Sequence, residues 1–391
     1  MKRIAIIGGG ISGLAAAHAL EKLRLAGAAI EYRLLEAGSR LGGVLRTEII
    51  DDCLIEAGPD SFLTEKSWAA DFCRELGLGD QLMGSNDSTR KTYILLKGRL
   101  APMPDGLMFM VPTKILPVLT SPLFSLSTKL RMAREWFHKP YASNDDEPVA
   151  ALVARHYGQE IVDRLIDPLL CGIYGGDAAR LSVKAVLPRF TEMEKTTGSF
   201  SRAMLAARRK SAGTSPRPLF TTLKGGMQQI SDAIGKQLDP ASVRCGAGVQ
   251  TVELTDAGWM ILGETFDALI VAVPSQSAAE MLQSTSADLA TELRSIEYSS
   301  SVTVALGYGR EVRAALPPGF GLLAPRSEGK RLLAATFVHN KFNCRAPEDR
   351  AVIRCFLGGT RDEAVLDLED GEIVQIVQRE LREILKITAE P

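Results

Sequence analysis

The apolar residues of this chain fall into short runs separated by glycine, proline and polar turns, and their spacing alternates between strand and helix periods. A β-branched run over residues 2–7 predicts a buried strand, and apolar positions over residues 14–20 predict a helix directly after it. The alternation continues as far as an amphipathic helix at residues 373–385. Strands that alternate with helices in this way predict an α/β fold.

The same patterns predict the remaining elements. Strands are expected at residues 31–35, 53–57, 242–245, 249–254, 259–262, 266–274, 301–308, 331–337 and 352–358, a hairpin over 93–100, and helices at 67–76, 149–157 and 228–238. Polar segments at residues 143–148 and 210–218 are predicted to be turns or loops. We expect the chain to alternate between two modules.

The first predicted strand runs into a glycine-rich turn, and the turn runs into the predicted helix. Gly8, Gly10 and Gly13 have the GxGxxG spacing of a dinucleotide-binding turn in its required context. Gly8 permits the tight turn, Gly10 lets the backbone approach a pyrophosphate, and Gly13 lets the helix pack close to the strand. The N–H groups at the start of the helix attract the phosphates.

The second predicted strand ends at Glu36, about 20 residues after the turn, where a carboxylate accepts hydrogen bonds from an adenosine ribose. A structural βα turn alone is a poorer explanation, because the strand, the helix and the acid all occur at the expected distances. The candidate dinucleotide-binding residues are Gly8, Gly9, Gly10, Ile11, Ser12, Gly13 and Glu36.

A second glycine pair directly after Glu36 favours a flavin over a nicotinamide. A nicotinamide-binding chain normally continues here into another helix, whereas this pair brings more backbone near the same dinucleotide, with an arginine beside it. The residues that this segment and the next turn add to the candidate cofactor site are Arg40, Gly42, Gly43, Val44, Gly58, Pro59, Asp60 and Ser61.

With these motifs the chain resembles the flavin-dependent amine oxidase superfamily, and within it the bacterial protoporphyrinogen/coproporphyrinogen oxidases of haem synthesis. The superfamily motifs are IIGGGISGLAAA at residues 6–17, EAGSRLGG at 36–43 and EAGPDSFLTEK at 56–66. More specific are LIDPLLCGIYGGDAARLSVKAVLP at 165–188, TLKGGMQQI at 222–230, GFGLLAP at 319–325, ATFVHNKFNCRAPEDR at 335–350 and FLGG at 356–359. The resemblance spans nearly the whole chain.

The resemblance implies an α/β protein in which a Rossmann-like FAD-binding domain is interleaved with an α+β substrate domain that carries a mixed sheet and a helical lid. The FAD-binding domain is expected at residues 1–90 and 216–275, and the substrate domain at 91–215 and 276–391. The resemblance also implies that Val249 contacts the adenine side of the cofactor, and strand packing at Val249 is compatible with that role.

The activity that the resemblance implies is oxidation of a porphyrinogen to the porphyrin, with FAD as hydride acceptor and oxygen as final electron acceptor. Protoporphyrinogen IX and coproporphyrinogen III both fit, and the oligomeric state stays open. Lys66 matches a substrate-binding position of some family members, and a solvent-exposed lysine is the alternative. We assign no catalytic residue, because no paired carboxylate, Ser/His/Asp or Cys/His arrangement has a supporting spacing.

Two other interpretations stay open. The chain could be another superfamily enzyme, such as an amine oxidase or a carotenoid desaturase. It could also be a catalytically silent fragment that binds flavin weakly or carries porphyrin. The last interpretation rests on residues 386–391, which do not match the family's final glycine-rich turn and helix over the flavin. From that mismatch we expect this 391-residue chain to retain little flavin and to have weak activity.

Composition excludes several other classes. A formal net charge of −1 provides no basic surplus for nucleic acid. The six cysteines and four histidines show no CxxC pair or metal-ligand spacing, so we predict no metal site and a cytoplasmic location. No run reaches the ~18–20 apolar residues of a membrane span.

The apolar, proline-broken segment from Pro102 to Phe137 has two compatible interpretations. Its last part carries Lys129, Arg131 and Arg134. An apolar patch beside basic residues can bind an anionic membrane surface, here the inner face of the cell membrane. The alternative is that the segment forms the core and lid of the substrate domain.

Overall fold

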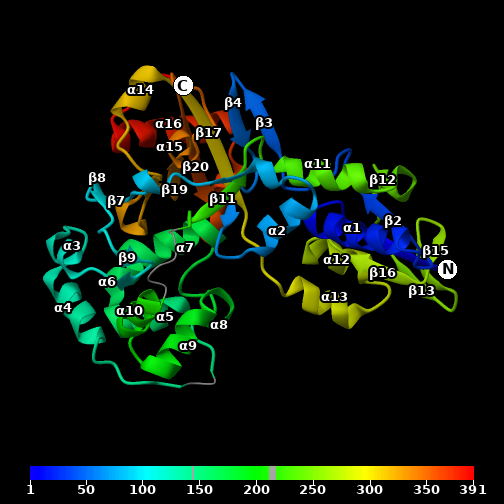
Figure 1. Ribbon diagram of the computed structural model, residues 1–391, viewed down its shortest axis with the longest axis horizontal. Helices are drawn as coiled ribbons and strands as arrows, with labels where there is room; N and C mark the ends of the chain where they lie inside the picture. The colour runs from blue at the N-terminus through cyan, green and yellow to red at the C-terminus, as the bar shows by residue number, and fades with distance from the viewer. Residues whose placement is uncertain (143–144, 211–216) are drawn as a thin grey trace. The chain divides into compact units, whose positions relative to one another are not determined.

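The computed structural model describes residues 1–142, 145–210 and 217–391, which form two compact units (Figure 1). The first unit contains Met1–Ser85 and Arg217–Tyr298, and the second contains Asn86–Pro216 and Ser299–Pro391. The chain therefore enters each unit twice. The predicted loops at 143–148 and 210–218, and the predicted boundary between residues 215 and 216, include residues that lie outside the described ranges.

A four-stranded parallel sheet organises the first unit. Its order is β12-β2-β1-β16. The strands are β1 (Lys2–Ile7), β2 (Ile30–Glu36), β12 (Val243–Cys245) and β16 (Ala268–Val271). Because β1 and β2 are parallel, the chain must cross over between them, and α1 (Ile11–Leu25) provides that crossover.

Successive side chains of β1 point to opposite faces of this sheet and enter two apolar clusters. Ile6 belongs to a cluster with Leu14 of α1 and Ile234 of α11 (Gln228–Gln237). Ala5 and Ile7 belong to a cluster on the other face, with side chains from the segment 249–282. Both faces of β1 are buried, which explains its uninterrupted apolar sequence.

The remaining elements of the first unit extend this core. They are the hairpin β3 (Thr47–Ile50) and β4 (Cys53–Glu56), the sheet of β5 (Phe62–Leu63), β11 (Phe220–Leu223) and β6 (Leu82–Gly84), and the meander β13 (Glu253–Thr255), β14 (Gly258–Ile261) and β15 (Glu264–Phe266). The helices are α2 (Trp68–Glu75), α12 (Ser275–Leu282) and α13 (Ala287–Arg294), with the short helical turns η1 (Gly79–Gln81) and η4 (Pro240–Ser242). The first unit extends past the expected boundary at residue 275, because Met281 and Leu282 of α12 pack in the cluster of Ile7.

The second unit is built on a six-stranded mixed sheet of order β17-β20-β19-β18-β7-β8. Its strands are β7 (Thr92–Leu96), β8 (Arg99–Pro102), β17 (Ser301–Gly309), β18 (Gly321–Leu323), β19 (Ala334–Phe337) and β20 (Arg350–Gly358). The β7–β18 pair is parallel, and the other neighbours are antiparallel.

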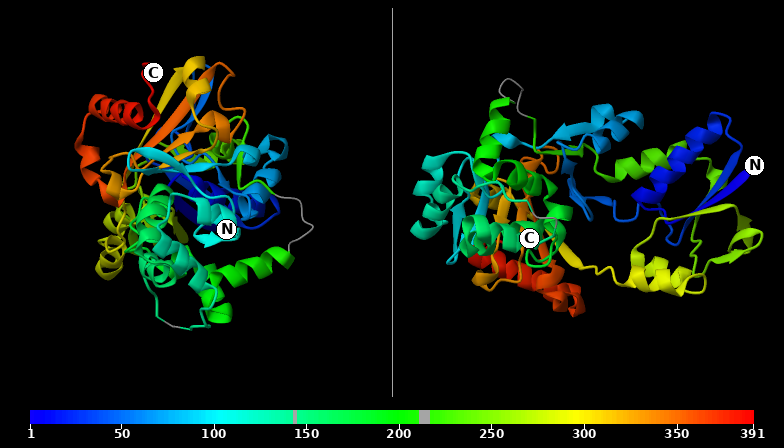
Figure 2. Two further views of the ribbon diagram at one scale, coloured as in Figure 1. Left: turned by 90° about the vertical axis from the view of Figure 1, so that its left-hand side faces the viewer. Right: turned by 90° about the horizontal axis from the view of Figure 1, so that it is seen from below.

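This sheet is covered on both faces. One face packs with α16 (Asp370–Leu385) through Ile353, Val377 and Leu381 (Figure 2, α16 in red). The other face contributes Ile94 and Leu323 to a helical core. The remaining strands and helices of the unit are β9 (Leu107–Met108), β10 (Val111–Pro112), α3 (Ile115–Thr120), α4 (Leu126–Glu135), α5 (Val149–Tyr157), α6 (Gln159–Ile161), η3 (Val162–Ile166), α7 (Asp167–Tyr174), α8 (Val183–Val186), α9 (Pro188–Thr197), α10 (Phe200–Lys210), α14 (Arg310–Ala315) and α15 (Val338–Lys341). The short helical turns are η2 (Asp87–Thr89), η5 (Arg326–Glu328), η6 (Gly359–Arg361) and η7 (Glu363–Asp367).

Most sequence-predicted elements are present, and two strand predictions are wrong. Residues 249–252 are not a strand, although Val249 and Val252 are buried as expected. The single strand expected at 266–274 is divided between β15 and β16, with Asp267 between them. Asp267 accepts hydrogen bonds from Lys2 Nζ and from the backbone N–H of Arg3, which interrupts the apolar run.

A buried ionic cluster joins helices of the second unit. His156 of α5 lies between two carboxylates, with its Nε2 2.7 Å from Glu194 of α9 and its Nδ1 3.4 Å from Glu135 of α4. Its ring stacks on Phe200 at a centroid distance of 4.0 Å. Only the imidazolium form has N–H groups on both ring nitrogens, so it can face both acids at once.

The surrounding groups stabilise the same charge state. Burial alone would lower the pKa of His156, but the carboxylates of Glu135 and Glu194 raise it above the ordinary value. Burial would raise the pKa of both acids, yet hydrogen bonds from His156 and other donors lower it. Arg155 forms ion pairs with Glu194 and Glu147, so the cluster contains three acids and two cations.

We predict that this cluster makes the free energy of unfolding of the second unit depend on pH. A raised histidine pKa contributes stability that is complete below the unfolded pKa of about 6.5 and is lost as pH rises through the folded pKa. The lowered carboxyl pKa values contribute stability above about pH 4.5 that is lost as pH falls. His156→Gln should lower the free energy of unfolding by about 3–5 kcal/mol. It should also remove the loss of stability that the wild type shows as pH rises above about 6.5.

Urea unfolding followed by circular dichroism between pH 5 and 9 tests this expectation. His18→Gln, at another buried histidine whose Nε2 lies 3.0 Å from Gln237, is the matched control. An identical pH slope in wild type and His156→Gln would refute it.

Candidate functional site

The turn after β1 and the first turn of α1 leave no room for a side chain at Gly8 or at Gly13. Gly8 has φ +108°, and a Cβ there would lie 2.5 Å from the carbonyl oxygen of Ala272. A Cβ at Gly13 would overlap the carbonyl oxygen of Gly8. At Gly10, by contrast, a Cβ would meet no atom within 4 Å. A bound group can therefore approach the backbone at Gly10.

The start of α1 is available to an anion. Gly10 is its N-cap residue, and within the described chain no side chain caps this helix and no acid lies in its first turn. The start of α11 differs, because Glu56 accepts the Met227 N–H at 2.8 Å and Thr47 Oγ1 accepts the Gln228 N–H at 3.1 Å. Unused N–H groups and the helix dipole favour a phosphate at α1.

Glu36 lies at the end of β2, directly beside this turn. Its two carboxylate oxygens accept the backbone N–H groups of Gly9 and Gly38, each at 2.6 Å. A carboxylate oxygen has two lone pairs, so both oxygens retain capacity for a hydroxyl donor. Glu36 can thus accept a hydrogen bond from a ribose bound beside Gly10.

The second glycine turn lies against the first. Gly42 donates its N–H to the Gly9 carbonyl oxygen at 2.8 Å and forms a parallel bridge with Gly10. The Arg40 guanidinium donates to the carbonyl oxygens of Gly43 at 2.5 Å and Leu45 at 3.0 Å, so it holds this turn in shape. The structure therefore brings the two glycine motifs together.

The segment from Gly58 to Ser61 returns to this turn after the β3–β4 hairpin. A Cβ at Gly58 would overlap the carbonyl oxygen of Val44, so the two backbones lie in direct contact. The Ser61 hydroxyl donates to Asp60 at 2.6 Å, and Val44 is 72% exposed. Pro59 follows Gly58 directly, so the start of this segment lies beside Val44 of the second glycine turn.

Two other predicted residues lie farther along the chain. Val249 is buried with Ile7 and Leu35, and the N–H of Ala247, two residues before it, donates to the Glu36 carbonyl oxygen at 2.8 Å. Lys66 is exposed in the turn before α2, where its backbone N–H donates to the carbonyl oxygen of Leu63. The structure brings Val249 near Glu36, and it shows no ion pair of Lys66 among the described residues.

The sequence analysis did not identify a group of hydrogen-bonded residues that lies beside the second glycine turn. Thr47, Glu56 and Gln228 form a hydrogen-bonded ring between β3, β4 and the start of α11. One signal was available, because Glu56 is a charged residue at the end of an apolar strand. Its partner at the start of α11, the Met227 N–H, is 171 residues away along the chain.

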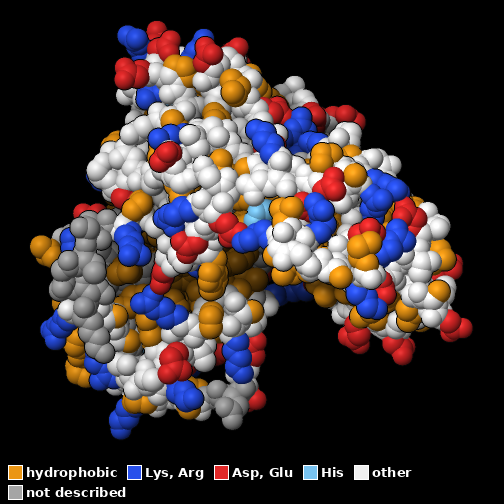
Figure 3. Space-filling view, turned by 45° about the vertical axis from the view of Figure 1, so that its right-hand side comes forward, with side chains coloured by type: hydrophobic (Ala, Val, Ile, Leu, Met, Phe, Trp, Pro, Cys, Tyr) orange, Lys and Arg blue, Asp and Glu red, His pale blue; other side chains and the backbone are white. Residues whose placement is uncertain are grey.

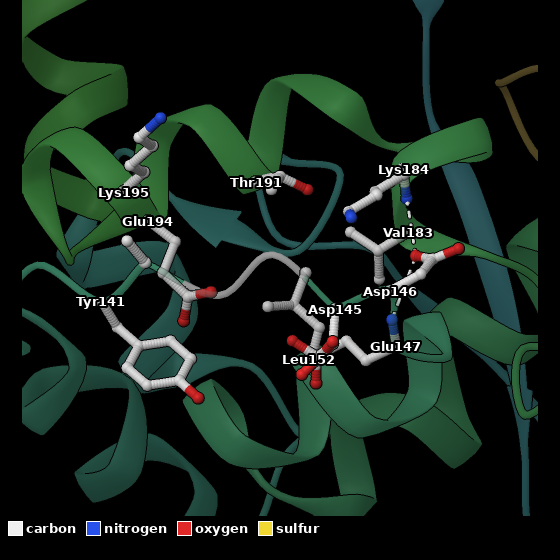
Figure 4. A pocket seen from close by; sticks show the side chains of 11 residues that line it. Tyr141, Asp145, Asp146, Glu147, Leu152, Val183, Lys184, Thr191, Glu194 and Lys195 are labelled. Atoms are coloured by element: carbon white, nitrogen blue, oxygen red, sulfur yellow. Dashed lines mark hydrogen bonds between the residues drawn. The ribbon is translucent and has the colours of Figure 1, made fainter.

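A small pocket in the second unit is a weaker candidate. It is lined by Tyr141, Ala142, Asp145, Asp146, Glu147, Leu152, Val183, Lys184, Thr191, Glu194 and Lys195 (Figure 4). Arg155 pairs with Glu147 and Glu194, and Asp146 accepts the backbone N–H of Lys184 at 3.2 Å. These acids are engaged in structural contacts. Among the described residues, no group of three His, Cys, Asp or Glu side chains could hold a metal ion.

Comparison with known proteins relates this geometry to named relatives. The coproporphyrinogen III oxidase of Bacillus subtilis (strain 168) is 34% identical over 400 residues, which cover 100% of this chain and 84% of that protein. Protoporphyrinogen oxidase 1, chloroplastic, of Arabidopsis thaliana is 29% identical over 97% of this chain and 74% of its own length. These names confirm the resemblance to the porphyrinogen oxidases.

Solved structures and a family model agree. A crystal structure of a protein from Exiguobacterium sp. 255-15 has a TM-score of 0.88 and 28% identity, and it covers 100% of this chain and 84% of that chain. A putrescine oxidase mutant, at 19% identity and a TM-score of 0.67 over 99% of this chain and 82% of its own, shares the fold. The model described as "Flavin containing amine oxidoreductase" matches residues 11–391. The chain therefore belongs to the family of flavin-containing amine oxidoreductases.

Proposed function

We propose that this protein is an FAD-dependent porphyrinogen oxidase of haem biosynthesis, with oxygen as electron acceptor. The observation that carries the proposal is the 34% identity to a coproporphyrinogen III oxidase, which extends over the whole of this chain. That relative favours coproporphyrinogen III as the substrate, and protoporphyrinogen IX is the alternative. An amine oxidase is a weaker candidate, because the putrescine oxidase structure is only 19% identical.

The candidate site fits an FAD. The open backbone at Gly10 and the uncapped start of α1 would hold the pyrophosphate, and Glu36 would accept the adenosine ribose. Arg40 would keep the second glycine turn in place, and Val249 would lie toward the adenine. When bound, the flavin supplies a hydride acceptor, while the protein supplies binding, orientation and exclusion of competing reactions.

We propose that a cationic side chain holds a carboxylate of the porphyrinogen. Lys66 is the candidate, because its exposed ammonium group is available for a charge-assisted hydrogen bond. On the face drawn in Figure 3, basic and acidic side chains are interspersed. A local contact of this kind would therefore matter more than a broad electrostatic attraction.

We also propose a cytoplasmic enzyme that contacts the membrane surface through α3 and α4. Leu116 of α3, Leu126 of α4 and Phe137 are 71%, 72% and 77% exposed. Other residues of the segment, such as Leu123 and Phe124, are buried in the helical core. Among the described residues, no helix is long and apolar enough to cross a membrane.

The function is tested by incubating the purified protein with coproporphyrinogen III and with protoporphyrinogen IX and following porphyrin fluorescence and oxygen uptake. We expect faster oxidation of coproporphyrinogen III. Lys66→Ala should raise KM several-fold with little change in kcat, because it removes a contact made equally in the ground and transition states. Lys236→Ala, at an exposed lysine of α11, is the control. No porphyrin from either substrate would contradict the proposal.

The cofactor assignment predicts a specific effect at Glu36. Glu36→Ala removes a charge-assisted acceptor of ~1.5–3 kcal/mol, so FAD affinity should fall about tenfold or more. Titration of flavin-free protein, followed by quenching of FAD fluorescence, measures the change. Glu31→Ala, at an exposed position of the same strand, should bind like wild type. Equal affinity in Glu36→Ala, or preference for NAD(P), would exclude the assignment.

The membrane contact predicts flotation with liposomes of anionic lipid at low salt, and loss of binding as salt screens the charges. Leu116→Glu should reduce flotation several-fold, because it places a charge in the apolar face. Leu254→Glu, at a leucine that is 60% exposed on β13 of the first unit, is the control. Equal flotation of the two variants would exclude the membrane contact. The segment from Pro102 to Phe137 would then serve only as part of the core.

A further inference from the structure

A closed ring of hydrogen bonds lies beneath the second glycine turn. Thr47 and Glu56 face each other directly across the β3–β4 hairpin, and the Thr47 hydroxyl donates to Glu56 Oε2 at 2.8 Å. Glu56 Oε1 accepts the Met227 N–H at 2.8 Å. Gln228 closes the ring, because its N–H donates to Thr47 Oγ1 and its side-chain oxygen accepts the Thr47 N–H, both at 3.1 Å.

The ring is tightly packed and mostly shielded from water. Glu56 is 6% exposed. Gly226 has φ +99°, and a Cβ there would overlap the Thr47 side chain. The chain at residues 225–228 can therefore approach β3 only because glycine occupies this position. The Thr47 hydroxyl and the Glu56 carboxylate are therefore held between three segments, which are β3, β4 and the start of α11.

The ring connects to both glycine turns through α11. Ser231, one turn after Gln228, donates its hydroxyl to the Gln228 carbonyl oxygen and lies where a Cβ on Gly42 would meet its Oγ at 2.8 Å. Gly42 in turn donates its N–H to Gly9. A continuous path of contacts therefore runs from Glu56 through α11 to the backbone beside Gly10.

We propose that Thr47 and Glu56 are positioning residues for the cofactor, which fix the second glycine turn against the first before the cofactor binds. The proposal rests on the FAD-binding function proposed above. A turn that is ordered only part of the time binds with an affinity reduced by the fraction of competent molecules. Buried partners that hold a binding segment in place raise affinity without touching the ligand.

The same ring gives α11 a different role from α1. Glu56 and Thr47 occupy the first N–H groups of α11, so this helix start does not compete with α1 for the phosphates. Loss of the ring should therefore loosen the second turn and also expose a second N–H cluster nearby. Both effects reduce the preference for one ordered arrangement of the cofactor.

The test compares Thr47→Val with Thr47→Ser in the full 391-residue protein. Valine has nearly the same shape as threonine but loses the hydroxyl, whereas serine keeps it. Flavin-free protein is titrated with FAD, and hydrogen exchange of residues 42–45 is measured in the same flavin-free samples. Thr47→Val should weaken FAD binding about fivefold to thirtyfold and speed exchange in that turn. Thr47→Ser should behave like wild type in both measurements.

Glu56→Gln extends the test to the other partner. It keeps an oxygen for the Met227 N–H but loses the charge, so an intermediate affinity is expected. Glu48→Gln, at a partly exposed acid of β3 that pairs with Arg46 and lies outside the ring, is the matched control and should change neither measurement. The proposal is wrong if Thr47→Val binds FAD like wild type, or if serine fails to restore the loss. If wild type takes up no FAD, the proposed function fails, while the exchange data still test the ordering of the turn by the ring.

Discussion

The absence of space between β1 and the start of α1 is the constraint on which the first unit depends. Gly13 packs directly on the Gly8 carbonyl, and a Cβ at residue 13 would overlap that oxygen, so only glycine allows α1 to lie this close to β1. That contact places the uncapped start of α1 beside the open backbone of Gly10 and close to the carboxylate of Glu36. The proposed cofactor site thus depends largely on where the backbone is placed.

The parts of this arrangement that sequence could predict are local. The GxGxxG turn, the acid at the end of β2 and the second glycine pair all lie within residues 8–43, and each follows from steric and hydrogen-bonding needs of short segments. The Thr47–Glu56–Gln228 ring was missed because its members come from distant segments. Only the folded chain shows that a carboxylate in one strand caps a helix far along the sequence.

The wrong strand predictions in the second half of the first unit have a similar origin. Residues 249–252 have strand-like composition but are buried by packing of Val249 and Val252 against the sheet, without a partner strand of their own. Likewise, nothing local marks α12 as part of the first unit, because Met281 and Leu282 gain their burial from Ile7 and Leu35. The spacing of apolar residues predicts that a segment is buried, but it does not predict which elements the segment packs against.

The order of the strands in the first unit also governs when that unit can form. β1 is flanked by β2 on one side and by β16, at residues 268–271, on the other. During synthesis from the N-terminus, the central strand therefore stays without one of its neighbours until more than two thirds of the chain has left the ribosome. The second unit's early helices emerge in the meantime, so the glycine-rich turn after β1 is among the first segments to be made and among the last to be enclosed.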